Sequence, residues 1–113
     1  MRHIDTESPE YLKWLREQTY YHGTSSNVKI LGNILKPSIE TGVIREQSLK
    51  YVYVTTSIKS AKKYAEKAAE EFGGWPVIYE VAPDFDSLVN RIDTEYTCDI
   101  AYIIDEIWVY LII

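Results

Sequence analysis

Apolar side chains recur at helical spacing in two stretches of the chain, residues 9–18 and residues 58–72. Ser8 stands before the first stretch, and Thr56 or Ser57 stands before the second. Serine and threonine oxygens accept hydrogen bonds from the first free N–H groups of a helix, so each stretch begins with a suitable N-cap. The lysines and glutamates of the second stretch indicate a solvated face and no function. The pattern therefore predicts two amphipathic helices.

Runs of aromatic and β-branched residues predict the strands. The first run ends at Tyr21-His22-Gly23, where the missing Cβ of glycine allows a tight, ligand-sized turn with the histidine at its mouth. Residues 51–55 and 77–82 form two more strands. The last run, residues 107–113, is apolar on both faces, which is typical of a strand in the middle of a sheet. Glu106 directly precedes this predicted strand.

Three other stretches lack a sustained period. Residues 28–35 are apolar and interrupted by a glycine, which indicates a short helix or a turn that covers the core. Residues 38–50 are mixed and polar, and we expect a surface loop near a pocket there. Residues 84–102 carry scattered acids, and we predict irregular structure with short strands.

Length, charge and cysteine content narrow the classes of protein that fit. At 113 residues the chain suits one domain with a single core. The net charge of −5 argues against strong non-specific binding to nucleic acids, which depends on clustered lysine and arginine. Cys98 is the single cysteine, so it forms no internal disulfide, and a cytoplasmic location is expected. The sequence contains no apolar run of about 18 residues, so we expect no membrane partner.

Three short motifs follow one another in order: Tyr21-His22-Gly23-Thr24, residues 51–55 with the alanine-rich helix after them, and residues 77–83. In this order they resemble the ADP-ribosyltransferase superfamily, most closely the small bacterial rifamycin ADP-ribosyltransferases, with features of the poly-ADP-ribose polymerase catalytic domain. The resemblance covers residues 20–113. It implies an α+β fold with a split, mostly antiparallel β core and flanking helices.

The same resemblance implies a domain organisation and an activity. Residues 1–113 would form one domain, with an N-terminal helix within 1–18 and an NAD-binding core in 19–113. The implied reaction transfers ADP-ribose from NAD, as co-substrate, to an acceptor and requires no metal. The acceptor is a small molecule, a protein or a nucleic acid, and the sequence does not choose among them.

The resemblance also assigns roles to residues of the first two motifs. His22 would hydrogen-bond a hydroxyl of the nicotinamide ribose, and the backbone of Gly23, with Thr24 beside it, would hold the nicotinamide carboxamide. Tyr53 would pack its ring on the nicotinamide, which makes His22 and Tyr53 catalytic as well as binding residues. Tyr64 stands where the polymerases carry a second aromatic wall, although a tyrosine at the edge of the buried helical stripe explains it equally well.

A carboxylate is required to stabilise the positive charge that develops on the ribose as nicotinamide leaves. Glu106 stands where the polymerases carry their catalytic glutamate. In the rifamycin enzymes the corresponding acid is an aspartate soon after the proline of the third motif, which here points to Asp86 or Asp84. A solvated carboxylate at a strand end is the alternative explanation for Glu106.

Two other functions stay open at this point. The chain is also consistent with a binding module of the same fold that reads NAD or ADP-ribose without catalysis, although His22, Tyr53 and Glu106 together argue against it. An RNA 2′-phosphotransferase of related fold would need several arginines in its pocket to hold phosphates. The arginines of this chain are Arg2, Arg16, Arg45 and Arg91.

Overall fold

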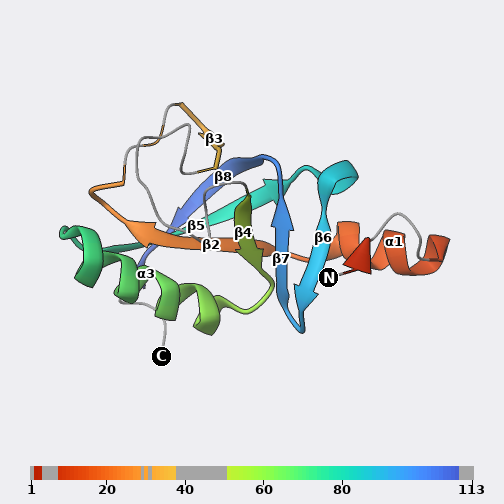
Figure 1. The fold of residues 1–113 in the computed structure, drawn as a ribbon, viewed down its shortest axis with the longest axis horizontal. Coiled ribbons are helices and arrows are strands. Elements are labelled where there is room, and N and C mark those ends of the chain that lie inside the picture. The colour runs from red at the N-terminus through yellow and green to blue at the C-terminus, as the bar shows by residue number, and fades with distance from the viewer. Residues whose placement is uncertain (1, 4–7, 29, 31, 38–50, 110–113) are drawn as a thin grey trace.

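The computed structural model describes residues 2–3, 8–28, 30, 32–37 and 51–109 of the chain (Figure 1). These residues contain two α-helices, α1 (Pro9–Glu17) and α3 (Ile58–Phe72), where the hydrophobic pattern predicts them. Ser8 caps α1 by accepting a backbone N–H of its first turn at 3.3 Å, and Ser57 caps α3 in the same way at 3.2 Å. Both helices therefore begin through local chemistry that the sequence already carries.

The described strands form one sheet in which every pairing is antiparallel (Figure 1). They are β1 (Arg2–His3), β2 (Tyr20–Ser25), β3 (Ile34–Leu35), β4 (Val52–Thr55), β5 (Pro76–Pro83), β6 (Val89–Ile92), β7 (Glu95–Cys98) and β8 (Ala101–Ile107). Their order across the sheet is β1-β6-β7-β4-β2-β5-β8-β3. A short 3₁₀-helix, η3 (Phe85–Ser87), follows β5. The α+β class with an antiparallel sheet is confirmed.

Two apolar clusters hold the helices against the sheet. In the larger cluster the buried Tyr20 of β2 donates its hydroxyl to the carbonyl of Leu15 in α1 at 2.7 Å, which fixes α1 at one end of the sheet. The rings of Phe85 and Tyr96 meet the Tyr20 ring edge-on. In the smaller cluster the alanine stripe of α3 packs on the buried Ile78 of β5. Helix α3 therefore lies alongside β2 and β5, away from α1 (Figure 1).

The predicted turn at Gly23 is wrong. Strand β2 continues through Gly23 to Ser25, and the turn comes after it, where the N–H of Val28 donates to the carbonyl of Ser25 at 3.0 Å. Glycine is required for packing instead, because a Cβ at this position would overlap the carbonyl oxygen of Ala61 and lie 2.8 Å from the amide nitrogen of Ala65. Gly23 thus permits the backbones of β2 and α3 to approach each other closely.

The last strand is also displaced from its predicted position. Ile107 ends β8 and does not begin it, so Glu106 lies inside the strand. Strand β8 lies between β5 and the short β3, one place from the edge of the sheet, and not in its middle. The β5–β8 ladder runs from Ala101 opposite Pro83 to Ile107 opposite Ile78, so both ends of β8 coincide with its pairing to β5. Residues 110–113 lie outside the described residues.

The stretches without a period have mixed outcomes. Residues 28–35 contain a turn, as one of the two alternatives, but end in β3, which pairs with β8. Residues 38–50, predicted to be a loop, lie outside the described residues. Residues 84–102 hold η3 and a β6–β7 hairpin, so the prediction of short strands is confirmed there.

Candidate functional site

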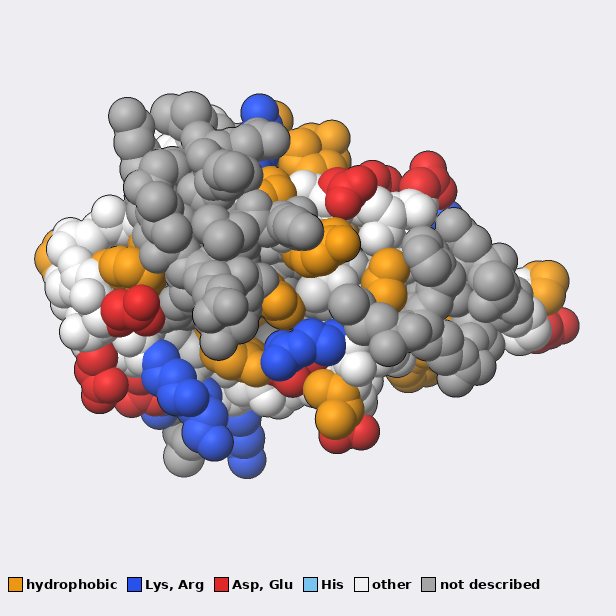
Figure 2. All heavy atoms as spheres, in the orientation of Figure 1, with side chains coloured by type: hydrophobic (Ala, Val, Ile, Leu, Met, Phe, Trp, Pro, Cys, Tyr) orange, Lys and Arg blue, Asp and Glu red, His pale blue; other side chains and the backbone are white. Residues whose placement is uncertain are grey.

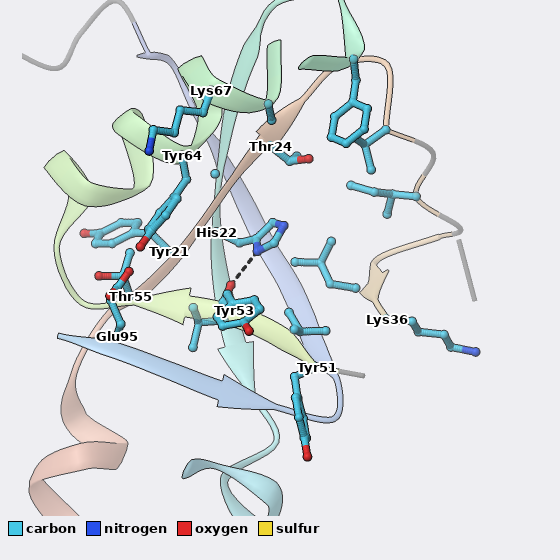
Figure 3. A pocket seen from close by; sticks show the side chains of 18 of the residues that line it. Tyr21, His22, Thr24, Lys36, Tyr51, Tyr53, Thr55, Tyr64, Lys67 and Glu95 are labelled. Carbon is cyan, nitrogen blue, oxygen red and sulfur yellow. Dashed lines mark hydrogen bonds between the residues drawn. The ribbon is translucent and has the colours of Figure 1, made fainter. Parts of the chain in front are cut away.

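A cavity of about 740 Å³ lies between β2, β4 and α3 (Figure 3). Strand β2 pairs with β5 along its whole length, whereas its ladder with β4 consists of Tyr21 opposite Thr55. Beside this short ladder, residues of both strands line the cavity, among them Gly23 and Thr24 from β2 and Tyr53 from β4. A volume of this size is typical of sites for small molecules and cofactors.

His22 links the two strands that form the cavity. Its Nδ1 lies 2.7 Å from the backbone carbonyl oxygen of Tyr53 (Figure 3). A carbonyl oxygen only accepts hydrogen bonds, so Nδ1 carries the proton and donates it. In the neutral ring this bond makes Nε2 the acceptor, which fixes the tautomer and the orientation of the imidazole. The His22 side chain is therefore suited to accept a hydrogen bond from a hydroxyl group of a ligand.

Aromatic side chains from three elements line the same cavity. Tyr21 comes from β2, Tyr53 from β4 and Tyr64 from α3 (Figure 3). All three are partly buried, so each ring keeps part of its surface available to a ligand. The structure thus brings together the five residues predicted to bind NAD: His22, Gly23, Thr24, Tyr53 and Tyr64.

The three candidate acids lie outside the set of cavity-lining residues. Glu106 is exposed on β8. It lies opposite Tyr79 of β5, and Tyr79 lies opposite His22 of β2. The three side chains therefore share one face of the sheet. Two strand spacings, about 10 Å, separate the backbones of His22 and Glu106. Burial raises the pKa of the Tyr79 hydroxyl, and the negative charge of the Glu106 carboxylate raises it further.

Asp84 and Asp86 occupy a different part of the molecule. Asp84 is the N-cap of η3 and accepts the backbone N–H of Asp86 at 3.2 Å. From Tyr79, the neighbour of His22, strand β5 runs roughly 13 Å to Pro83 before η3 begins. The structure therefore does not bring these two aspartates to His22, and Asp84 has a local structural role.

Several charged residues that sequence reasoning missed line the cavity. Lys67 lies one turn after Tyr64 on α3, and this i, i+3 spacing was the signal that could have placed it beside the tyrosine. Arg91 and Glu95 come from the β6–β7 hairpin. No local sequence pattern predicts that the β6–β7 hairpin lies beside the cavity. Its position depends on the pairing of β4 with β7, which are far apart in the sequence.

Other candidate chemistries find less support in the described residues. Burial raises the pKa of the Cys98 thiol to about 12, so this cysteine stays protonated and inaccessible. Among the described residues, no three histidine, cysteine, aspartate or glutamate side chains gather as a metal site. In the same part of the chain no helix is long and apolar enough to span a membrane.

No protein-family model matches this sequence, and no curated protein matches it. The functional interpretation therefore depends on the arrangement of residues in the cavity.

Proposed function

We propose that this protein binds NAD in the cavity between β2, β4 and α3 and transfers its ADP-ribose group to an acceptor. The proposal is supported by one observation above all: His22, Tyr53 and Tyr64, from three separate elements, line a single cavity. Their residue types suit a nicotinamide riboside, because aromatic rings stack on the planar base and the imidazole accepts from a ribose hydroxyl. We also propose that the sheet has the split β core of the ADP-ribosyltransferases. The acceptor would be a small molecule, a protein or a nucleic acid.

In the proposed reaction the bond between the ribose carbon and the nicotinamide nitrogen breaks. The bonding electron pair stays on the nicotinamide, the acceptor forms a new bond to the ribose carbon, and the acceptor releases a proton. Tyr53 and Tyr64 hold the leaving base, while His22 fixes the ribose through Nε2 because its Nδ1 is engaged by the Tyr53 carbonyl. A carboxylate is needed near the ribose, and Glu106 is the candidate that shares a sheet face with His22.

NAD is expected to raise the melting temperature of the purified protein, because a ligand that binds the folded state alone stabilises it by mass action. At NAD concentrations about a hundred times the Kd, the shift should be on the order of 10 °C for a domain of this size. The measurement is a thermal melt with NAD, nicotinamide or buffer. An unchanged melting temperature with both ligands would contradict the proposed site. Label transfer from NAD into a cell lysate then separates a transferase from a module that only binds.

Tyr53→Ala is expected to weaken NAD binding and nicotinamide release roughly tenfold or more, since base stacking on an aromatic ring contributes about 1–3 kcal/mol. Tyr102→Ala is the matched control, because Tyr102 is a half-exposed tyrosine of β8 that does not line the cavity. Calorimetric titration of NAD and a nicotinamide-release assay measure the two effects. Equal losses in both variants, at unchanged melting temperatures, would remove the special status of Tyr53.

A further inference from the structure

A β-bulge in the β6–β7 hairpin determines where Arg91 lies. Asn90 is paired with Tyr96, but the next pair joins Ile92 to Glu95, so Arg91 is an extra residue on β6. Two residues, Arg91 and Ile92, therefore oppose the single Glu95. Bulges of this kind redirect side chains and occur often beside binding sites. Here the bulge places Arg91 at the cavity wall and leaves Ile92 largely exposed.

The Arg91 guanidinium is held by two neighbours that also line the cavity. Its central carbon lies 5.1 Å from the centre of the Tyr53 ring, within the range of a cation–π contact. Its Nη1 lies 3.6 Å from a carboxylate oxygen of Glu95, whose side chain is 19% exposed. That separation is longer than a hydrogen bond, and a guanidinium carries five N–H donors. The ring and the carboxylate thus orient Arg91 and leave it donors for a ligand.

The charges that line the cavity suggest how it could recognise an anion. Lysine and arginine side chains gather over α3 and beside the β6–β7 hairpin (Figure 2), although the whole chain has a net charge of −5. Among the described residues, three cations line the cavity, Lys36, Lys67 and Arg91, together with three glutamates. These charges balance, so the described part of the lining has no general excess of positive charge. Recognition of an anion there requires a directed donor, and a planar guanidinium matches two phosphate oxygens at once.

We propose that Arg91 is the phosphate-binding residue of the cavity and that it engages the diphosphate of the bound dinucleotide. The choice of a dinucleotide diphosphate rests on the proposed function, whereas the guanidinium by itself indicates a ligand with paired anionic oxygens. In NAD a single ribose separates the nicotinamide from the first phosphate. Arg91 lies against Tyr53, the ring proposed to hold the nicotinamide, so it is close to where that phosphate is expected.

The test is calorimetric titration of wild type, Arg91→Gln and Arg91→Lys with three probes: inorganic pyrophosphate, ADP-ribose and nicotinamide. Arg91→Gln should weaken pyrophosphate and ADP-ribose binding about tenfold or more, because a charge-assisted hydrogen-bond pair is lost. Nicotinamide binding should not change. Arg91→Lys should give intermediate losses of affinity for pyrophosphate and ADP-ribose, since lysine keeps the positive charge but lacks the paired N–H donors of the guanidinium.

Arg16→Gln is the matched control, because Arg16 lies 5.0 Å over the Phe85 ring in the same kind of contact, outside the cavity lining. It should leave the binding of all three probes unchanged. Pyrophosphate and ADP-ribose affinities that are equal in wild type and Arg91→Gln would overturn the proposal. An equal loss of nicotinamide binding would also overturn it, since Arg91 would then act by positioning Tyr53.

The same titrations separate this proposal from the proposed function. If wild type binds nicotinamide and ADP-ribose and Arg91→Gln binds both equally well, the phosphate assignment fails and the transferase proposal stands. If wild type binds pyrophosphate through Arg91 but does not bind nicotinamide, the phosphate site is supported and the transferase proposal fails. A wild type that binds neither pyrophosphate nor ADP-ribose overturns the phosphate site.

Discussion

Gly23→Ala is expected to destabilise the protein by about 3 kcal/mol or more, which corresponds to a fall of roughly 10 °C in melting temperature. The added methyl group would overlap the backbone carbonyl of Ala61 and crowd the amide of Ala65. Backbone atoms inside a helix cannot rotate away as a side chain does, so α3 would have to move off β2 as a whole. Thermal and urea unfolding of the variant measure the effect.

Gly32→Ala provides the matched control for this prediction. Gly32 has a φ of +65°, and apart from its chain neighbours no heavy atom of the described residues lies within 4 Å of the added Cβ. Its substitution should cost only about 1–2 kcal/mol, the strain of a left-handed backbone for alanine. Equal losses of stability in the two variants would show that the close approach of α3 to β2 is not what requires glycine at position 23.

Glu106→Gln is expected to lower the rate of nicotinamide release on the order of a hundredfold while NAD still binds. The substitution keeps the size of the side chain and removes the negative charge, which matters most when positive charge develops on the ribose. Glu106 is two strands from His22 on the same sheet face, with Tyr79 between them. Single-turnover assays of the folded variant, with NAD affinity measured separately, test this role.

Asp84→Asn and Asp86→Asn complete the test of the acid. Both residues belong to the η3 region beyond the end of β5, so both variants should release nicotinamide at nearly the wild-type rate. A hundredfold loss in either one, with Glu106→Gln nearly unaffected, would transfer the role to that aspartate. Near-wild-type rates in all three variants would direct attention to Glu95, a carboxylate that lines the cavity itself.

The parts of the fold that were predictable from the sequence depend on local chemistry. The helices begin at Ser8 and Ser57 because an N-cap needs only its own first turn. The predicted strand at residues 51–55 agrees with β4 to within one residue, since β4 begins at Val52. The partnership of His22 with Tyr53 followed from the resemblance, and the structure brings both to one cavity.

The features that the sequence did not predict correctly depend on contacts between segments that are far apart in the chain. The sequence predicts a turn at Gly23 because glycine favours turns, whereas the requirement for glycine comes from a helix almost forty residues further on. The sequence predicts a strand that begins at Ile107, but pairing with β5 places β8 at Ala101–Ile107. The bulge that places Arg91 is a property of two paired strands, and neither strand alone encodes it.

The strand order has a consequence for how the cavity forms during folding. Strand β2 pairs with β5, which follows it by about half the length of the chain, and β4 pairs with β7 over a similar distance. Pairings of such long range form slowly, because the entropy of closing the intervening loop is lost before the contacts contribute. On the ribosome, His22 and Tyr53 therefore emerge long before the strands that hold them in place. The cavity is assembled late, and a nascent chain that has not yet reached β7 carries His22 and Tyr53 without the cavity that they line.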